Sequence, residues 1–244
     1  FLSHRMNIVS IIPVRLAATR FPNKPFAKID GLPMFHYVYN KVLESCPNTL
    51  LAICDEKIET YCRNHNLQFI STNPNHQSGS DRVGEVISKI EMKKNIHKVI
   101  NIQGDMPFIS KEHIKLLTSK IDYFEMSTLG CPLIDKKEFQ DLNKVKLLIK
   151  EDNKNVVAEN FFREPMHASE MNVNTFHHIG LYGYQISFLK KFLQMPISRR
   201  EKTEKLEQLR IQDLNKIGVS IIKENILGVD TKEDLIKVNN ILKK

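Results

Sequence analysis

Apolar and polar positions along this chain follow two rhythms, short β-branched runs and longer segments with a helical period. In the first half the two rhythms alternate, with a strand followed each time by a helix. The expected strands are 7–13, 50–54, 68–71 and 98–102, and the expected helices are 33–43, 56–66, 81–90 and 111–120. Because alternating strands and helices build parallel sheets with right-handed crossovers, this half predicts a doubly wound, mostly parallel α/β sheet. Its strand-to-helix loops are expected at one edge.

The rhythm changes in the second half. Residues 126–162 offer extended segments with little helix between them, so we predict a smaller β-rich insertion subdomain over residues 126–176. The other elements expected there are a strand at 178–184, helices near 186–193 and 203–214, a strand at 219–223, a turn at 228–230 and a final helix with Thr231 as N-cap. Thr231 and Asp234 have the spacing of a capping box. We interpret residues 6–244 as one domain and residues 1–5, ahead of Met6, as vector-derived or upstream residues.

The composition is that of an ordinary globular chain, with 244 residues, 41% of them hydrophobic and 26% charged. No run is long and apolar enough for a transmembrane helix, and the N-terminus lacks the organisation of a signal peptide. The four cysteines, Cys46, Cys54, Cys62 and Cys131, do not have the paired spacing of a zinc site or a disulfide framework. We therefore expect reduced thiols in a cytoplasmic protein.

The formal net charge of +8 is compatible with nucleic acid, a membrane surface or a polyanionic small substrate as partner. Lysine is spread along the chain, however, without an arginine-rich block or an aromatic platform between the basic residues. This distribution favours a solvated surface over a nucleic-acid footprint. RNA binding remains an alternative that rests on net charge alone.

The strand expected at 98–102 ends abruptly in Gln103, Gly104 and Asp105, and Pro107 prevents the ladder from continuing. Ligands of open α/β sheets bind beyond the carboxyl ends of the strands. Asp105 is therefore expected where a metal or a phosphate is handled. The alternative is an aspartate that caps the following turn.

The first strand runs into a loop, residues 13–25, that carries Arg15, Arg20 and Lys24 between prolines. Arginine grips phosphate oxygens with two donors and lysine adds a compact charge, so the loop is suited to a triphosphate. No Walker-type glycine pattern is present, which disfavours a P-loop ATPase. A solvated basic surface loop is the alternative.

Six segments of the chain together resemble one enzyme family. They are the loop at 13–25, HQSGSDRVGEV at 76–86, INIQGDMP at 100–107, HIGLYGY at 178–184, KLEQLR at 205–210 and GVDTKEDL at 228–235. In this order and spacing they resemble the cytidylyltransferases that activate 3-deoxy-D-manno-octulosonate (Kdo), the CMP-Kdo synthetases. They also separate the chain from the sialic-acid cytidylyltransferases, which share the general fold. The resemblance implies a nucleotide-diphospho-sugar transferase-like, Rossmann-like fold.

The resemblance also implies a reaction. The anomeric hydroxyl of Kdo attacks the α-phosphate of CTP, and CMP-Kdo forms with release of pyrophosphate, for lipopolysaccharide biosynthesis. Charge builds on phosphoryl oxygens in such a reaction, so positioning and electrostatic stabilisation supply most of the catalysis. The implied cofactor is Mg²⁺, and the implied assembly is a homodimer, through the β-rich subdomain. Neither a nucleic acid nor a membrane is an implied partner.

Site residues are assigned by the same resemblance. The catalytic set is Arg15, Lys24, Asp105 and Asp230, of which Asp105 and Asp230 are the metal ligands. The CTP-binding set is Arg15, Arg20, Lys24, Ser78, Gly79 and Arg82, and the sugar-binding set is Gln103, Arg163, His178, Tyr182, Tyr184, Glu207 and Gln208. Two alternatives stay open: Arg82 supports the fold instead, and residues 77–79 form only a loop and a helix cap. His178 is assigned a substrate contact without general-base chemistry.

The chain departs from the family pattern at several positions. Met106 stands where a carboxylate or amide commonly follows Gln-Gly-Asp, Asn23 replaces a glycine, and Cys54 replaces a hydroxyl residue. Residues 162–165 are only a loose match. An octulosonate with an amino group at C8, or another acidic sugar, is therefore an alternative substrate. Met106 also supports a further alternative, a nucleotide-sugar-binding protein with impaired catalysis.

Overall fold

The computed structural model describes residues 7–16, 21–76, 78–90, 96–166, 174–211 and 216–243. The chain divides into two compact units. The first comprises Phe1–Ile114 and Ile226–Lys244, and the second is Lys115–Asn225. The division falls within helix α4 (Lys111–Ile121), and residues 126–176 are part of the second unit.

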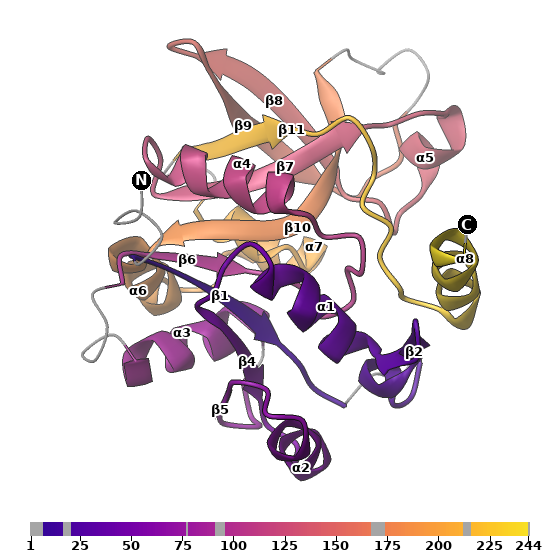
Figure 1. Ribbon diagram of the computed structural model, residues 1–244. Coiled ribbons are helices and arrows are strands. Elements are labelled where there is room, and N and C mark those ends of the chain that lie inside the picture. Colours follow the sequence, from indigo (N-terminus) through magenta and orange to yellow (C-terminus); the bar gives the residue numbers. More distant parts are fainter. Residues whose placement is uncertain are drawn as a thin grey trace. The chain divides into compact units, whose positions relative to one another are not determined.

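Four parallel strands form the sheet of the first unit, in the order β5-β4-β1-β6 (Figure 1). They are β1 (Ile8–Pro13), β4 (Thr49–Ile53), β5 (Phe69–Ser71) and β6 (Lys98–Asn101). All five residues of β4 are buried, as are Val9, Ile11 and Ile12 of β1. Near-continuous apolar strands are typical of a parallel sheet covered on both faces. The strands and helices predicted for this half are confirmed, with ends that differ by at most two residues.

Helices α1 (Met34–Leu43), α2 (Glu56–Asn64) and α3 (Gly79–Ile90) each connect two of these strands. Strand order advances from β1 through β4 to β5 and then returns to β6 beside β1. Because crossovers between parallel strands are right-handed, this reversal puts α3 on the sheet face opposite to α1 and α2. The loops after β1 and β6 thus leave neighbouring strands at the point where the chain changes direction, which is the usual ligand position in such sheets.

A small hairpin in the first unit was not predicted. It pairs β2 (Lys28–Ile29) with β3 (Leu32–Pro33) and turns at Asp30 and Gly31, whose φ angles are 47° and 78°. Two successive residues with positive φ are typical of a tight hairpin turn, and Asp-Gly is a strong sequence signal for it. The hairpin follows a 3₁₀ turn, η2 (Lys24–Phe26), within what was expected to be irregular loop.

Five strands of the second unit form a closed circuit. They are β7 (Met126–Pro132), β8 (Lys146–Asp152), β9 (Asn155–Phe162), β10 (Thr175–Gln185) and β11 (Ile217–Ile221). Their order is β10-β7-β11-β9-β8, and β10 also pairs with β8. All pairings are antiparallel except β7 with β11. The extended character of 126–162 is confirmed, interrupted only by the short α5 (Lys136–Gln140). The closure into a circuit was not predicted.

The helix predicted at 203–214 is wrong. Helix α7 (Arg199–Glu204) begins after Ser198, whose hydroxyl accepts from the Glu201 N–H, and ends where Lys205 takes a left-handed φ of 54°. A separate 3₁₀ turn, η4 (Glu207–Arg210), follows. A buried ion pair between Arg210 Nη2 and Glu201 Oε1, 2.5 Å long, holds the turn against α7. The preceding α6 (Ile186–Gln194) agrees with its prediction.

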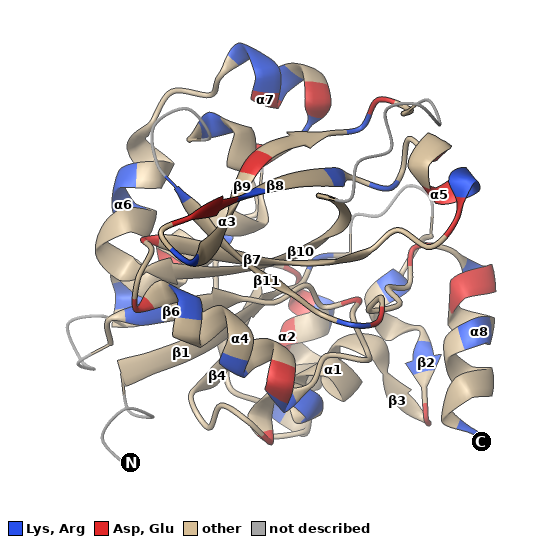
Figure 2. Cartoon of the chain, turned by 90° about the horizontal axis from the view of Figure 1, so that it is seen from above, with Lys and Arg blue, Asp and Glu red and all other residues tan. Residues whose placement is uncertain are grey.

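Basic and acidic side chains are intermixed over the helices, with both signs on α8 (Lys232–Leu242), for example (Figure 2). This pattern agrees with a solvated surface and gives no support to a nucleic-acid platform. Within the described residues, no helix has the length and apolar character needed to cross a bilayer.

Close packing around one glycine of β11 generates a stability prediction. A Cβ at Gly218 would lie 2.5 Å from the Phe124 ring, whereas a Cβ at Gly180 would meet nothing within 4 Å. We expect Gly218→Ala to lower the free energy of unfolding by about 1–3 kcal/mol because the ring must move. Gly180→Ala is the matched control and should change it by less than about 1 kcal/mol. Urea denaturation of both variants tests this, and equal losses would contradict it.

Candidate functional site

A pocket of about 490 Å³ lies in the first unit, at the point where strand order reverses. Its lining comes from the loop after β1, the η2 turn, the start of α3, the loop after β6 and the segment before α8. The lining residues are Pro13, Val14, Arg15, Phe21, Lys24, Pro25, Met34, His76, Ser78, Gly79, Arg82, Gln103, Gly104, Asp105 and Asp230. The pocket therefore brings together most of the predicted nucleotide and metal residues, and Gln103 with them. Arg20 lies outside the described residues.

Lys24 joins the two predicted metal ligands. Its ammonium Nζ donates to Asp105 Oδ2 at 2.6 Å, to Asp230 Oδ1 at 3.1 Å and to the Val229 carbonyl at 2.9 Å. Burial lowers the pKa of Lys24, but Asp105 and Asp230 outweigh this effect and raise the pKa above its ordinary value. The lysine is thus a firmly protonated cation between two carboxylates.

Local backbone geometry presents Lys24 to the pocket. Asn23, the residue before η2, has a φ of 56°, in the left-handed region. Glycine and asparagine are the residues that adopt this conformation most readily. The replacement of the family's usual glycine by Asn23 therefore preserves the turn.

The segment before α8 brings Asp230 to Asp105. The Val229 N–H donates to the Asp105 carbonyl at 2.9 Å, and the Val229 side chain is fully buried in an apolar cluster with Met34 and Val238. Burying such a side chain contributes about 1.5–3 kcal/mol. This docking holds the two aspartates at one site although they are far apart in sequence.

The N-terminus of α8 continues this arrangement. Thr231 and Asp234 form the predicted capping box, with both reciprocal hydrogen bonds present, which confirms the prediction. Asp234 Oδ2 also accepts from the Asp230 N–H at 3.2 Å. The cap therefore orients the backbone of Asp230, whose side chain is 67% exposed and faces the pocket.

The two carboxylates fit a magnesium ion as a donor set. Each has one oxygen that makes no hydrogen bond to another described residue, namely Oδ1 of Asp105 and Oδ2 of Asp230. Mg²⁺ prefers such oxygens and completes its shell with phosphates and water. Over the described part of the chain, no group of three or more His, Cys, Asp or Glu side chains could hold a metal. Mg²⁺ needs only one or two protein carboxylates when phosphates and water supply its other ligands, and this pair of carboxylates meets that number.

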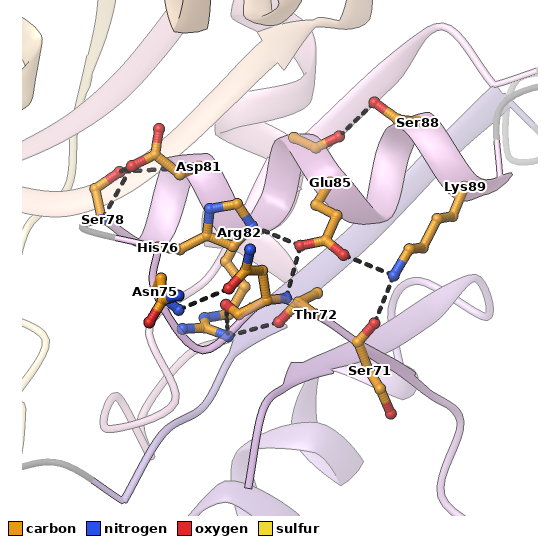
Figure 3. A network of polar contacts seen from close by, with 12 residues as sticks. Ser71, Thr72, Asn75, His76, Ser78, Asp81, Arg82, Glu85, Ser88 and Lys89 are labelled. Carbon is orange, nitrogen blue, oxygen red and sulfur yellow. Dashed lines mark hydrogen bonds and ion pairs between the residues drawn. The ribbon is translucent and has the colours of Figure 1, made fainter.

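Ser78 directly precedes α3 and also lines the pocket. Its hydroxyl and Asp81 Oδ2 lie 2.9 Å apart, and each side chain accepts from the other residue's N–H, at 3.1 Å (Figure 3). The helix-cap interpretation is thus correct for Ser78. It does not exclude a ligand role, because a helix N-terminus carries N–H donors suited to polar ligands. Gly79 lines the same part of the pocket.

Arg82 is both a pocket residue and a structural one. It is 2% exposed, and its Nη1 donates to the Thr72 hydroxyl at 2.5 Å and to the Asn73 carbonyl at 3.4 Å (Figure 3). These bonds tie α3 to the segment after β5. The alternative that Arg82 supports the fold therefore describes these contacts best, although Arg82 also lines the pocket.

His76 belongs to the site and Glu85 contacts it, but neither residue was singled out in the sequence. His76 lines the pocket, and its Nε2 lies 2.5 Å from Glu85 Oε2 (Figure 3). Glu85 also accepts from the Asn73 N–H at 2.8 Å and from Lys89 at 2.6 Å. The signal available was the segment HQSGSDRVGEV, which contains both residues. This network anchors the approach to α3.

The other predicted sugar residues lie in the second unit. Tyr182 donates to Gln208 Oε1 at 2.9 Å, and its ring centroid lies 5.6 Å from that of His178. The ring centroid of Tyr184 lies 6.0 Å from that of Tyr182. Glu207 precedes Gln208 in η4. The structure therefore places His178, Tyr182, Tyr184 and Gln208 in one cluster, buried in the described chain.

Arg163 is held by backbone carbonyls. Its Nε donates to Glu204 at 3.0 Å, and its Nη1 donates to Leu142 and Asn143, both at 3.3 Å. Among described residues Nη2 makes no hydrogen bond. Buried Lys146 donates in turn to the Arg163 carbonyl at 3.2 Å.

Comparisons with known proteins show the family of this chain. Residues 9–221 match the family described as Cytidylyltransferase. Similar curated proteins include the 8-amino-3,8-dideoxy-manno-octulosonate cytidylyltransferases of Shewanella putrefaciens (strain CN-32 / ATCC BAA-453), 35% identical over 241 residues, and Shewanella baltica (strain OS195), 34% identical over 242 residues. Each alignment covers 95% of this chain and 97% of the relative.

Two solved structures extend the comparison. A CMP:2-keto-3-deoxy-manno-octonic acid synthetase complexed with CTP has a TM-score of 0.86 and 29% identity, over 97% of this chain and 98% of the other. A 4-diphosphocytidyl-2C-methyl-D-erythritol synthase from Anaerococcus prevotii DSM 20548 has a TM-score of 0.65 at 12% identity, over 98% and 100% of the two chains, and is similar in fold alone.

The anchoring of Glu85 predicts a dependence of stability on acid. Burial acts to raise the pKa of Glu85, but hydrogen bonds from Lys89, Asn73 and His76 outweigh it and lower the pKa from 4.5 to about 2. A carboxyl with a depressed folded-state pKa stabilises the protein above pH 4.5, and this contribution is lost as the pH falls towards 2.

Glu85→Gln should therefore flatten the fall of unfolding free energy across that pH range. Glu44→Gln, at a side chain that is 65% exposed, is the control and should leave the slope unchanged. Chemical denaturation at a series of pH values measures both slopes. A Glu85→Gln profile parallel to the wild type would refute the assignment.

Proposed function

Since the chain belongs to the cytidylyltransferase family, in its octulosonate (CMP-Kdo synthetase) branch, we propose that it transfers CMP from CTP to the anomeric hydroxyl of a 3-deoxy-manno-octulosonate and releases pyrophosphate. The observation that carries this proposal is the pocket in which Lys24, Asp105 and Asp230 meet beside Ser78 and Gly79. Lys24 and the α3 N-terminus can meet phosphate oxygens, and the two carboxylates can hold the Mg²⁺ that accompanies a triphosphate.

On this proposal the nucleotide is held by the first unit. Arg15 and Lys24 bind the triphosphate, with Arg20 from the same loop, and neutralise charge that develops on the leaving pyrophosphate. Ser78 and Gly79 receive the cytosine, and Arg82 fixes the helix on which they stand. Lys24 must then exchange carboxylate partners for phosphate oxygens as the nucleotide enters.

Asp105 and Asp230 would hold Mg²⁺. The ion, when bound, withdraws charge from the phosphoryl oxygens and fixes the triphosphate in one orientation. The chain's own contribution is the geometry of the two carboxylates, which Val229 and the α8 cap determine.

The resemblance assigns sugar binding to Gln103 in the first unit and to polar residues of the second unit. A polyhydroxy acid needs at least one cation and several neutral hydrogen-bonding groups. Arg163 supplies the cation, and His178, Tyr182, Tyr184, Glu207 and Gln208 supply polar partners. The product's place in lipopolysaccharide biosynthesis, a cytoplasmic location and a homodimeric assembly complete the proposal.

The 8-amino form of the sugar is the second candidate acceptor. It is favoured by the names of the curated relatives at 34–35% identity, whereas the solved structure named for the unsubstituted sugar is 29% identical. Both acceptors present the same anomeric hydroxyl and carboxylate, so the chemistry of the first unit is common to them.

A substrate panel tests the function. With CTP and Mg²⁺, we expect pyrophosphate release with Kdo, with 8-amino-3,8-dideoxy-manno-octulosonate, or with both, and none with N-acetylneuraminate. The ratio of kcat/KM for the two octulosonates then identifies the preferred one. CTP binding by calorimetry without turnover of either octulosonate would contradict the proposal and would favour a nucleotide-sugar-binding protein with impaired catalysis.

Replacement of the carboxylates tests the metal assignment. We expect Asp105→Asn and Asp230→Asn each to lower kcat by about 10²-fold or more, because each removes a carboxylate that would hold the Mg²⁺ needed to stabilise charge on the phosphoryl oxygens. The free energy of unfolding should change by no more than about 1 kcal/mol, since both groups are partly exposed. Asp30→Asn is the control, at a hairpin turn outside the pocket lining where asparagine tolerates the φ of 47°. Unchanged rates in both site variants would remove the assignment.

A further inference from the structure

A hydrogen-bond network in the second unit determines which ring nitrogen of His178 carries a proton. His178 lies on β10 and Thr128 on the neighbouring β7. The Thr128 hydroxyl oxygen lies 2.9 Å from His178 Nε2, 2.9 Å from the Leu181 carbonyl and 3.2 Å from the Ile179 carbonyl. All these groups are buried.

A count of protons decides the direction of each bond. The threonine hydroxyl has one proton and two lone pairs, and both carbonyls can only accept. If the hydroxyl donated to Nε2, two carbonyl oxygens would face its lone pairs in a buried site, which is unfavourable. The hydroxyl therefore donates to a carbonyl, that of Leu181 being the nearer, and accepts from the His178 Nε2–H.

An irregularity of the strand creates this arrangement. The pairing of β10 with β7 shifts register between Ile179 and Tyr182, so Thr128 pairs with Tyr182 while Leu129 pairs with Ile179. Because of this shift, the carbonyls of Ile179 and Leu181, on both sides of Gly180, face the Thr128 hydroxyl and not the backbone N–H groups of a regular ladder.

His178 is uncharged in this setting. Burial, and the charges of His177 and Arg163, lower its pKa to about 3. With a proton on Nε2 alone, Nδ1 carries a lone pair and can only accept. Nδ1 makes no hydrogen bond to another described residue.

A second observation in the cluster points to a ligand. Gln208 is 1% exposed, and its Oε1 accepts from Tyr182, but its Nε2 is buried without a hydrogen-bond partner among the described residues. A buried amide donor without a partner costs free energy unless a ligand satisfies it. The cluster thus offers a donor at Gln208 and an acceptor at His178, which suits a hydroxyl-rich molecule.

We propose that Thr128 is a positioning residue that holds His178 as the neutral Nε2–H tautomer, so that His178 Nδ1 accepts a hydrogen bond from a hydroxyl or ammonium donor of the sugar. The proposal rests on the proposed function for the sugar contact, whereas the tautomer is a property of the free protein. His178 thereby recognises a donor on the acceptor substrate and takes no part in proton transfer.

The tautomer is measured by ¹⁵N NMR of histidine-labelled protein without substrate, with the His178 signal assigned from a His178→Asn variant. Long-range proton–nitrogen correlations distinguish a protonated Nε2 and an unprotonated Nδ1 from the reverse. We expect the former. A protonated Nδ1 in the wild-type protein would overturn the proposal, and this measurement needs no turnover.

Kinetics test the consequence. Thr128→Val removes the oxygen that fixes the ring, so we expect KM for the octulosonate to rise about tenfold while KM for CTP changes little. Thr128→Ser keeps the hydroxyl and should restore the wild-type KM. Thr175→Val is the matched control, because Thr175 is a buried threonine of β10 whose hydroxyl has no hydrogen-bond partner within the described chain.

The outcomes distinguish failure of the positioning role of Thr128 from failure of the proposed function. A sugar KM unchanged in Thr128→Val, or raised equally in Thr175→Val, would overturn the positioning role. If Thr128→Val does not fold, the wild-type tautomer and Thr128→Ser still decide, since a serine variant with a raised sugar KM counts against the role. If the expected tautomer is present but no octulosonate is turned over, the proposed function fails and the sugar contact falls with it.

Discussion

The contact on which the pocket depends is one ammonium group shared by two carboxylates. Asp105 follows strand β6, Asp230 precedes α8, and Lys24 Nζ lies within 3.1 Å of an oxygen of each. Two partly buried carboxylates at one site repel each other without a cation. Lys24 supplies that cation in the free protein, so the site can be assembled by folding before any ligand arrives.

Backbone connections convert this contact into a fixed geometry. The reversal of strand order brings the ends of β1 and β6 side by side, and Val229 bonds to Asp105 through its N–H and to Lys24 through its carbonyl. Val229 is also buried among apolar side chains. Burial of the hydrophobic cluster thereby holds the polar groups in position. Ion pairs at a partly exposed site contribute too little free energy to do this alone.

Structure that depends on neighbouring residues was mostly predicted correctly from the sequence, whereas strand pairings between distant residues were not. The strands and helices of the first unit and the capping box at Thr231 depend on residue periodicity and short-range hydrogen bonds, so they could be predicted. The closed circuit of strands depends on β8 reaching β10, and no local pattern specifies such a pairing. The prediction of a helix at 203–214 was wrong because the left-handed backbone of Lys205 ends α7. The ion pair between Arg210 and Glu201 joins two residues on either side of this break. Asp105 and the basic residues Arg15 and Lys24 were singled out from a strand end and a loop. The resemblance was needed for the other predicted pocket residues, among them Ser78, Gly79 and Asp230, whereas His76, Glu85 and Thr128 act through contacts that only the structure reveals.

Placing Asp230 on the cap of α8 ties the site to the docking of that helix. A single helix can open at a lower free energy than a whole domain unfolds, and such openings occur within the native ensemble. Each opening of α8 carries Val229 and Asp230 away from Asp105 and leaves Lys24 with one carboxylate. The fraction of molecules with α8 docked therefore sets an upper limit on the fraction that holds both carboxylates together, and a ligand that bridges them favours the docked helix.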